Sequence, residues 1–262
     1  MVVNASVPVP ELGSVPAPEP VYLHAANVGD PVFGVFHAAP APAETAVLFL
    51  PPFGYDDVCA YRALRMWALS LSAEGIASLR IDLPGTGDSG GSPRDPGRAA
   101  AWPRAAAASA AWLRERTGAR RVVAFGVGLG GLIAGQAVVE GAEIDDLVLW
   151  GAHARGKALV RELRAFARLG ISKVEDFAWD LATMPPLPEG SLESGGFLLS
   201  PETVTWLQAL DLSATPLPDA ERRQVLLLGR EGISVDARLR SEERRVGKEC
   251  LSVCRSRWSP YH

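Results

Sequence analysis

Short apolar runs alternate with helical segments along most of this chain. Helical spacing of apolar residues recurs between the runs, as in residues 61–74 and 129–140. Strands buried on both faces are continuously apolar, and their alternation with helices is typical of parallel βαβ units. The sequence therefore predicts an α/β fold with a mostly parallel sheet and helices on both faces. The predicted buried strands are residues 45–50, 76–83, 121–125, 146–150 and 224–228.

Two stretches depart from this alternation and define the predicted domains. Residues 21–37 alternate loosely around turn residues, which predicts a hairpin at a sheet edge. Residues 151–223 separate the last two strands; they begin with a helical stretch and continue with a mixture of Pro, Gly and acidic residues, which predicts a small cap over the strand ends. We divide the chain into a Pro-rich, disordered lead-in (1–20), a core (21–156), a cap insertion (157–219) and a return to the core (220–239).

A glycine-rich turn joins the strand at 121–125 to the helix that follows it. Its frame is Gly126-x-Gly128-x-Gly130. This matches G-x-S-x-G, a strained turn that lifts a nucleophilic serine above a sheet, but glycine stands in the serine position. Glycine tolerates the strained backbone and offers no oxygen for attack. We therefore predict that Gly128 occupies the nucleophile position without being a nucleophile.

The same turn also spells the dinucleotide fingerprint G-x-G-x-x-G, through Gly126, Gly128 and Gly131. That fingerprint usually follows the first strand of a sheet and precedes an acidic residue at the end of the next strand. Here the turn follows at least four predicted strands, and Asp145 and Asp146 come before a strand. The nucleotide-binding alternative is therefore the weaker one.

Two further segments bear on catalysis. The loop Leu50-Pro51-Pro52-Phe53-Gly54 follows the first buried strand, where an oxyanion-binding loop is expected. We predict that the amide of Phe53 or Gly54 pairs with that of Leu129 to form the hole; a simple tight turn is the plainer interpretation. Residues 87–91 spell GDSGG, a serine-protease motif of a two-barrel β fold. Because these residues follow a buried parallel strand, we interpret Ser89 as a turn residue.

The acid and the base of a triad are harder to place. In triads built on such a turn, the acid comes after the serine and before the histidine in the chain. We expect it after the strand at 224–228, three residues beyond Gly229, but this position holds Gly232. That leaves Glu231 or Asp236, and Asp236 could equally cap a helix. A catalytic histidine is expected after the last strand. Of the four histidines, His24 and His37 precede the glycine turn, His153 follows a strand that comes too early, and His262 lies in the tail. The sequence thus predicts that the catalytic histidine is missing.

The last 23 residues, 240–262, differ in composition and in apolar periodicity from the rest. They are rich in Arg, Ser and Glu, have no apolar period, and resemble a translated sequencing adapter. We exclude them from the fold as artefactual, so that the natural product is expected to continue past Leu239, with a last strand and helix missing here. Cys250 and Cys254 leave with the tail, and Cys59 alone predicts a reducing compartment.

Several further segments point to a known family: Pro51-Pro52-Phe53, Asp82-x-x-Gly85-x-Gly87-Asp88-Ser89, 147–150, 156–163, 195–200 and 210–212. Together with the glycine turn, they resemble the α/β-hydrolase superfamily over roughly residues 21–239, within it the serine-aminopeptidase-like (S33) branch, and most closely the hydrolases associated with exosortase A systems. This resemblance implies an α/β-hydrolase fold and hydrolysis of an ester, thioester or amide by a triad, with neither a metal nor an organic cofactor. Gly128, Gly232 and the end of the chain depart from the pattern.

Charge and composition limit the classes of binding partner that we expect. The formal charge of -4 gives no reason to expect nucleic acid or an anionic membrane, and no apolar run is long enough to span a bilayer. No secretory signal is recognisable, which predicts a cytoplasmic protein. Two functions stay open: a hydrolase of a small acyl-type substrate whose serine is replaced, or a catalytically inactive protein that binds such a molecule in the same pocket.

Overall fold

The fold is built on one mixed sheet whose strands run mainly parallel. The computed structural model describes residues 15–41, 44–171, 187–229 and 237–239. The seven strands lie in the order β1-β2-β4-β3-β5-β6-β9; β2 is antiparallel to β1 and to β4, and all other neighbours are parallel. They are β1 (Glu19–Leu23), β2 (Val32–His37), β3 (Thr45–Leu50), β4 (Ala77–Ile81), β5 (Arg121–Val127), β6 (Asp146–Trp150) and β9 (Val225–Leu228).

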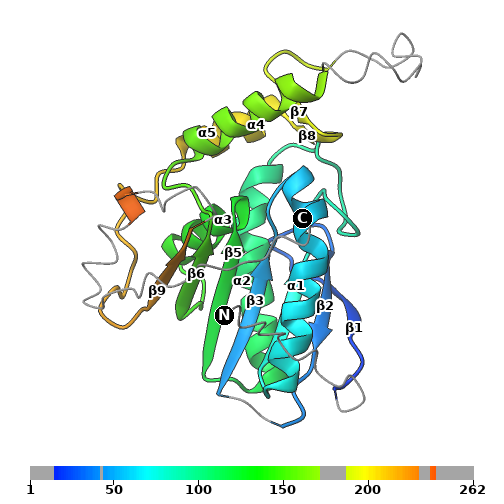
Figure 1. The fold of residues 1–262 in the computed structure, drawn as a ribbon, viewed down its shortest axis with the longest axis vertical. Coiled ribbons are helices and arrows are strands. Elements are labelled where there is room, and N and C mark those ends of the chain that lie inside the picture. The colour runs from blue at the N-terminus through cyan, green and yellow to red at the C-terminus, as the bar shows by residue number, and fades with distance from the viewer. Residues whose placement is uncertain (1–14, 42–43, 172–186, 230–236, 240–262) are drawn as a thin grey trace, which may run out of the picture.

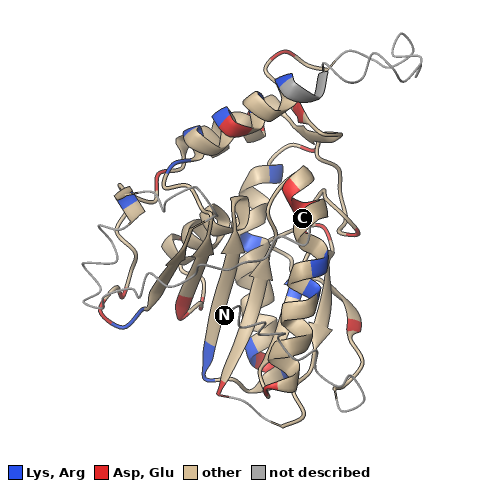
Figure 2. Cartoon of the chain, viewed as in Figure 1, with Lys and Arg blue, Asp and Glu red and all other residues tan. Residues whose placement is uncertain are grey.

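Helices cover both faces of the sheet (Figure 1). Alternate residues of β3 separate the two layers: Leu48 and Leu50 pack into the larger core with α2 (Arg98–Thr117) and α3 (Leu129–Val139), whereas Phe49 packs into a smaller core with α1 (Tyr55–Ala73). Charged residues are sparse along the middle of the strands (Figure 2). Within the described residues, no helix is both long and apolar enough to span a membrane.

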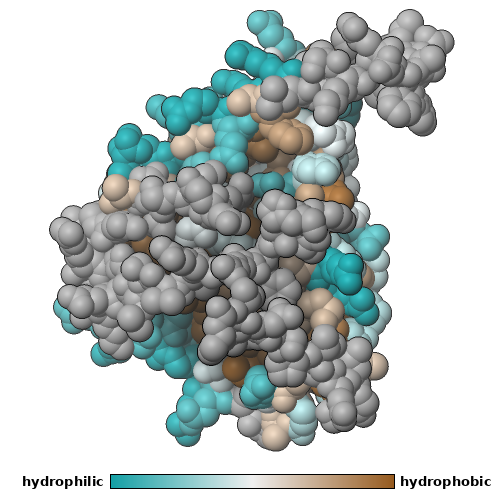
Figure 3. Space-filling view, viewed as in Figure 1, coloured by the Kyte–Doolittle hydropathy of each residue, from teal (hydrophilic) through white to brown (hydrophobic). Residues whose placement is uncertain are grey.

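The cap consists of α4 (Gly156–Ile171), the antiparallel hairpin β7 (Leu192–Ser194) and β8 (Phe197–Leu199), and α5 (Pro201–Ala209). It lies above the carboxyl ends of the parallel strands (Figure 1). Helix α4 is amphipathic: Leu159 and Val160 are buried while Arg161 is exposed. In Figure 3 the outer side of the cap is hydrophilic, and apolar surface lies beneath it.

Most predicted elements of the core are confirmed. The strands at 45–50 and 146–150 have the predicted bounds, and residues 21–37 contain the predicted edge hairpin. Helix α1 begins at Tyr55, six residues before the predicted start, because Gly54 adopts a left-handed φ of 72° and two aspartates follow it in the first turn. Strand β1 begins at Glu19, inside the segment that we predicted to be a disordered lead-in.

The elements of the cap beyond α4 were not predicted from the sequence. The β7–β8 turn uses two glycines with positive φ, Gly195 at 62° and Gly196 at 86°, as tight hairpins require. Helix α5 has a strong start signal: the Ser200 hydroxyl accepts a hydrogen bond from the amide of Thr203 at 3.2 Å, and Pro201 stands in the first turn. Apolar periodicity misses such short elements, although their turn and capping residues are visible in the sequence.

Candidate functional site

The site begins at the turn between β5 and α3, where Gly128 adopts φ 52° and ψ −110°. An L-residue in such a conformation costs about 1–3 kcal/mol, which identifies the turn as a strained one. The amide of Gly128 donates to the carbonyl of Trp150 at 2.9 Å, and its carbonyl accepts from the amide of Gly131 at 3.2 Å. The strained turn predicted from the glycine frame is therefore present, and its central residue has no side chain.

Neighbouring glycines allow the turn to be this tight. A β-carbon on Gly126 would lie 2.5 Å from the backbone of Gly130. A β-carbon on Gly130 would lie only 2.2 Å from the carbonyl oxygen of Leu50, at the end of β3. The first turn of α3 is therefore pressed against the loop that follows β3.

This close approach brings the two predicted donor segments together. Pro51 and Pro52 have no backbone N–H, so Phe53 and Gly54 carry the first amides after β3. Leu129 opens α3, and the first amides of a helix have no partner within it. The arrangement can present two N–H groups to one carbonyl oxygen; which amides do so stays a prediction.

The cap covers this loop from above. Phe53 is buried and meets the ring of Phe197 in β8 edge to face, with the centroids 5.9 Å apart. Tyr55 stacks on Phe166 of α4 at 5.7 Å. Cap and core therefore touch through aromatic rings beside the glycine turn, which gives any ligand held there an apolar boundary.

The predicted acid lies outside the described residues, as do Glu231, Gly232 and His262, so the structure says nothing of Asp236. Of the remaining histidines, His24 follows the edge strand β1. His37 is the last residue of β2, and the strands β4 and β3 separate β2 from β5, which leads into the glycine turn. Burial, together with the charges of Arg80 and Arg65, lowers the pKa of His37 from 6.5 to about 4, so this side chain stays neutral.

His153 lies at the same end of the sheet as the glycine turn, beyond the carboxyl ends of the parallel strands β5 and β6. A β-carbon on Gly131, in the first turn of α3, would lie 2.5 Å from the β-carbon of Ala152, the residue before His153. The Nε2 atom of His153 is 2.7 Å from a carboxylate oxygen of Glu162 in α4. A histidine held by a carboxylate is an arrangement suited to proton transfer. Sequence analysis rejected His153 as the base because it follows a strand that comes too early in the chain.

Ser89 is a structural residue in the turns after β4. Its hydroxyl donates to the carbonyl of Asp82 at 2.7 Å and accepts from the amide of Phe33 at 2.8 Å. Its side chain is thus occupied by the backbone of two strand ends, in agreement with the prediction that Ser89 is not a nucleophile.

Asp57 is a perturbed carboxyl group near the site that the sequence did not reveal. Its amide donates to the carbonyl of Gly54 at 3.0 Å, in the first turn of α1. Burial, reinforced by the charge of Asp82, raises the pKa of Asp57 from 3.8 to about 6, and Arg80 offsets part of the rise. The folded protein therefore holds this proton more tightly than the unfolded chain does.

This shift predicts a pH-dependent effect of Asp57→Asn. Stability contributed by the protonated carboxyl is complete below pH 3.8 and is lost as the pH rises to about 6. After allowance for solvent screening, the asparagine variant should be more stable than the wild type by about 1–2 kcal/mol at pH 7 and equal to it at pH 4. Thermal melts at both pH values measure this, with Asp56→Asn in the same helical turn as the control. An equal difference at both pH values would contradict the assignment.

Fold and site together define a class: a mostly parallel sheet with a strained strand–turn–helix, an adjacent amide-bearing loop and a cap. A profile of the Alpha/beta hydrolase family matches residues 47–244. The chain belongs to this family, and the predicted fold class is confirmed. The match ends five residues beyond Leu239, the last residue before the segment that we predicted to be an artefactual tail.

Solved structures share the fold at low sequence identity. Est1E from Butyrivibrio proteoclasticus, described with ferulic acid bound, is 17% identical with a TM-score of 0.54, over 81% of this chain and 82% of that one. The Pyrococcus furiosus esterase Pf2001 is 13% identical with a TM-score of 0.54, over 90% and 78% of the two chains. No curated protein matches the chain.

Proposed function

We propose that this chain binds a small acyl compound, an ester, thioester or amide, beneath its cap, and that it forms no covalent acyl-enzyme at the glycine turn. One observation carries the proposal: Gly128 stands at the centre of the strained turn, with φ 52°, and has no side chain. A hydrolase turn that keeps its shape and its neighbouring amides retains the means to hold a carbonyl oxygen. What it lacks is the atom that attacks.

Within the family, we place the chain in the serine-aminopeptidase-like branch, beside the hydrolases of exosortase A systems, and we expect it to act in the cytoplasm. This placement is supported by the resemblance of the segments 156–163 and 195–200, both of which lie in the cap or at its base. On this view the chain is a pseudoenzyme, and residues 240–262 are an artefactual tail.

A steady-state hydrolysis assay tests the proposal. With p-nitrophenyl acetate, p-nitrophenyl butyrate and a thioester as substrates, the wild type should hydrolyse none of them at more than about 10³ times the rate in water, the level that a binding pocket and oxyanion hole sustain without a triad. Methyl ketone analogues of the same acyl chains should raise the melting temperature. Rates typical of serine esterases would overturn the proposal, as would the absence of any stabilising acyl ligand. Because Est1E is described with ferulic acid bound, methyl ferulate is a useful additional probe.

A second function, slow hydrolysis without serine, is favoured by the contact between His153 and Glu162. In this mechanism the imidazole removes a proton from water, and the resulting hydroxide attacks a carbonyl polarised by the amides of the turn. The tetrahedral intermediate then collapses, the bond from the carbonyl carbon to the leaving group breaks, and the imidazolium returns the proton to the leaving group. The pair is 2.7 Å apart and bridges the core and the cap helix α4.

Two substitutions distinguish residual hydrolysis from simple binding. If His153 is the base, His153→Ala should lower the residual rate by about 10²-fold, as expected for loss of a general base, and Glu162→Gln should shift its pH profile. Ketone binding, measured by thermal shift, should survive both changes. If the residual rate is the same in His153→Ala as in the wild type, the pair has no catalytic role, and the protein is a binder only.

A further inference from the structure

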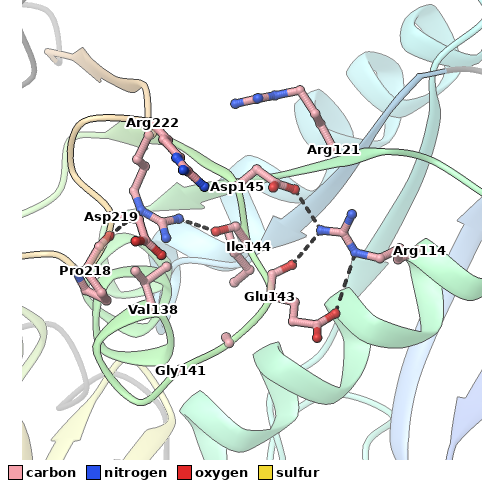
Figure 4. Close-up of a pocket in the computed structure, with 12 residues that line it drawn as sticks. Arg114, Arg121, Val138, Gly141, Glu143, Ile144, Asp145, Pro218, Asp219 and Arg222 are labelled. Atoms are coloured by element: carbon pink, nitrogen blue, oxygen red, sulfur yellow. Dashed lines mark hydrogen bonds and ion pairs between the residues drawn. The ribbon is translucent and has the colours of Figure 1, made fainter.

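A cavity lies at the opposite end of the sheet from the glycine turn. It has a volume of about 570 Å³, within the range of small-molecule sites. Arg121, which begins β5, lines it, whereas Gly128 follows the end of β5. Seven strand residues separate the two ends by about 20 Å, so the cavity is distinct from the acyl site. Its walls come from the end of α2, the start of β5, the α3–β6 loop and the segment before β9, as Figure 4 shows.

Two of the lining arginines are already neutralised. Arg114 forms an ion pair with Asp145 at 2.7 Å and also donates to the carbonyl of Glu143 at 3.0 Å. Arg121 forms a bidentate pair with Asp146, with contacts of 2.6 and 2.7 Å. These pairs link the start of β6 to the end of α2 and to the start of β5. Positive charge that is available to a ligand must therefore come from other residues of the cavity.

Arg223 differs, because no carboxylate among the described residues contacts its buried guanidinium; the charges of Asp145, Asp146 and Asp219 act on it only from a longer distance. Only 7% of the residue is exposed. Its guanidinium donates to the carbonyl oxygens of Ile144 and Pro218, which leaves three of its five N–H groups without an acceptor among the described residues. No carboxylate in the described part of the chain lies within 4.0 Å of it. A buried charge in this state is costly unless an opposite charge compensates it.

The residue before it adds a second cation to the wall. Arg222 is exposed and forms no ion pair within the described residues. The amides of Arg222 and Arg223 both donate to the carbonyl of Asp219, at 2.9 and 3.2 Å, and Asp219 itself has a left-handed φ of 54°. This turn therefore sets two consecutive arginines beside one cavity, with the carboxylate of Asp219 as a nearby opposing charge (Figure 4).

We propose that this cavity binds a small phosphomonoester, whose phosphate is held by Arg222 and the free N–H groups of Arg223. Guanidinium groups match phosphate oxygens in pairs, and the phosphate supplies the directly bonded anion that Arg223 lacks among the described residues. The volume exceeds what a phosphate ion needs, so the organic part of the ligand occupies the remainder. The carboxylate of Asp219 limits the affinity and favours a ligand with a single phosphate over a polyanion.

Thermal melts and calorimetric titrations with inorganic phosphate and glycerol 3-phosphate test this proposal, at constant ionic strength set with potassium chloride. Both ligands should raise the melting temperature saturably, and glycerol 3-phosphate should bind more tightly. Arg222→Gln should weaken binding by about tenfold, the effect of losing one charge-assisted contact. Asp219→Asn should strengthen it severalfold, because it removes the opposing charge. Acetate, which has the charge but not the tetrahedral oxygens, should have little effect.

Arg62→Gln serves as the matched control, since Arg62 is an exposed arginine on α1, away from the cavity. It should leave phosphate binding unchanged. Equal loss in Arg62→Gln and Arg222→Gln would show non-specific screening and overturn the proposal. So would the absence of binding at millimolar phosphate, or stronger binding of acetate than of phosphate. The acyl-ligand assays probe the other end of the sheet, so either proposal can fail without the other.

Discussion

Gly130→Ala should destabilise the protein by about 3 kcal/mol or more, although alanine is the better helix former. The new β-carbon would lie 2.2 Å from the carbonyl oxygen of Leu50 and 2.7 Å from that of Pro51. Both are backbone atoms that cannot rotate away, so α3 must move off the end of β3. The melting temperature should fall by roughly 6–12 °C for a chain of this size.

Gly135→Ala is the matched control, because Gly135 lies in the same helix. The nearest atoms to its β-carbon would all belong to the side chain of Leu212, with the methyl groups at 2.6 and 2.9 Å, and this side chain can change rotamer. We expect a change within about 1 kcal/mol, since better helix propensity offsets the crowding. If the two variants melt at the same temperature, the close approach of α3 to the loop after β3 is not what holds the turn together.

Gly128→Ser should not create an efficient serine hydrolase. The serine would have to adopt φ 52°, which costs about 1–3 kcal/mol, so the variant should melt lower than the wild type. Its hydroxyl would also need a base. His153 offers one ring nitrogen to Glu162 at 2.7 Å, and no described histidine is placed after the last strand, where the family's base is expected.

We therefore expect the variant to hydrolyse p-nitrophenyl acetate no more than about tenfold faster than the wild type, against a contribution of about 10⁶ from a complete triad. Gly128→Ala, which has the same backbone strain but no hydroxyl, is the control. Kinetics with a burst of p-nitrophenol would contradict this expectation and would show that a base reaches residue 128.

The sequence predicted the core of the fold well, because strands that are buried there are visible as short runs of apolar residues. Strand β3 is continuously apolar since both of its faces are covered, and its bounds were obtained residue for residue. The strained turn was predictable because glycines must occupy positions where a β-carbon would meet backbone, as at Gly126 and Gly130.

The parts that the sequence missed depend on contacts that form only in the folded chain. His153 and Glu162 are nine residues apart, and their pairing depends on how the chain turns from the loop after β6 into α4, which no pattern in the sequence indicates. The raised pKa of Asp57 comes mainly from burial in the folded protein, with a further contribution from the charge of Asp82 at the end of β4. The buried charge of Arg223 depends on carbonyls contributed by the α3–β6 loop and by Pro218. Such features follow from tertiary packing and have no local pattern.

In the function that we propose, the glycine turn of this hydrolase fold holds acyl groups without bonding to them. Intact-mass spectrometry of the wild type after rapid quenching from excess p-nitrophenyl butyrate tests it most directly, because an acyl-enzyme adds the mass of one acyl group. We predict unmodified protein at every time point, together with a raised melting temperature in the presence of the ketone analogue. A stoichiometric acyl adduct that forms within the first turnover and then disappears would contradict the claim.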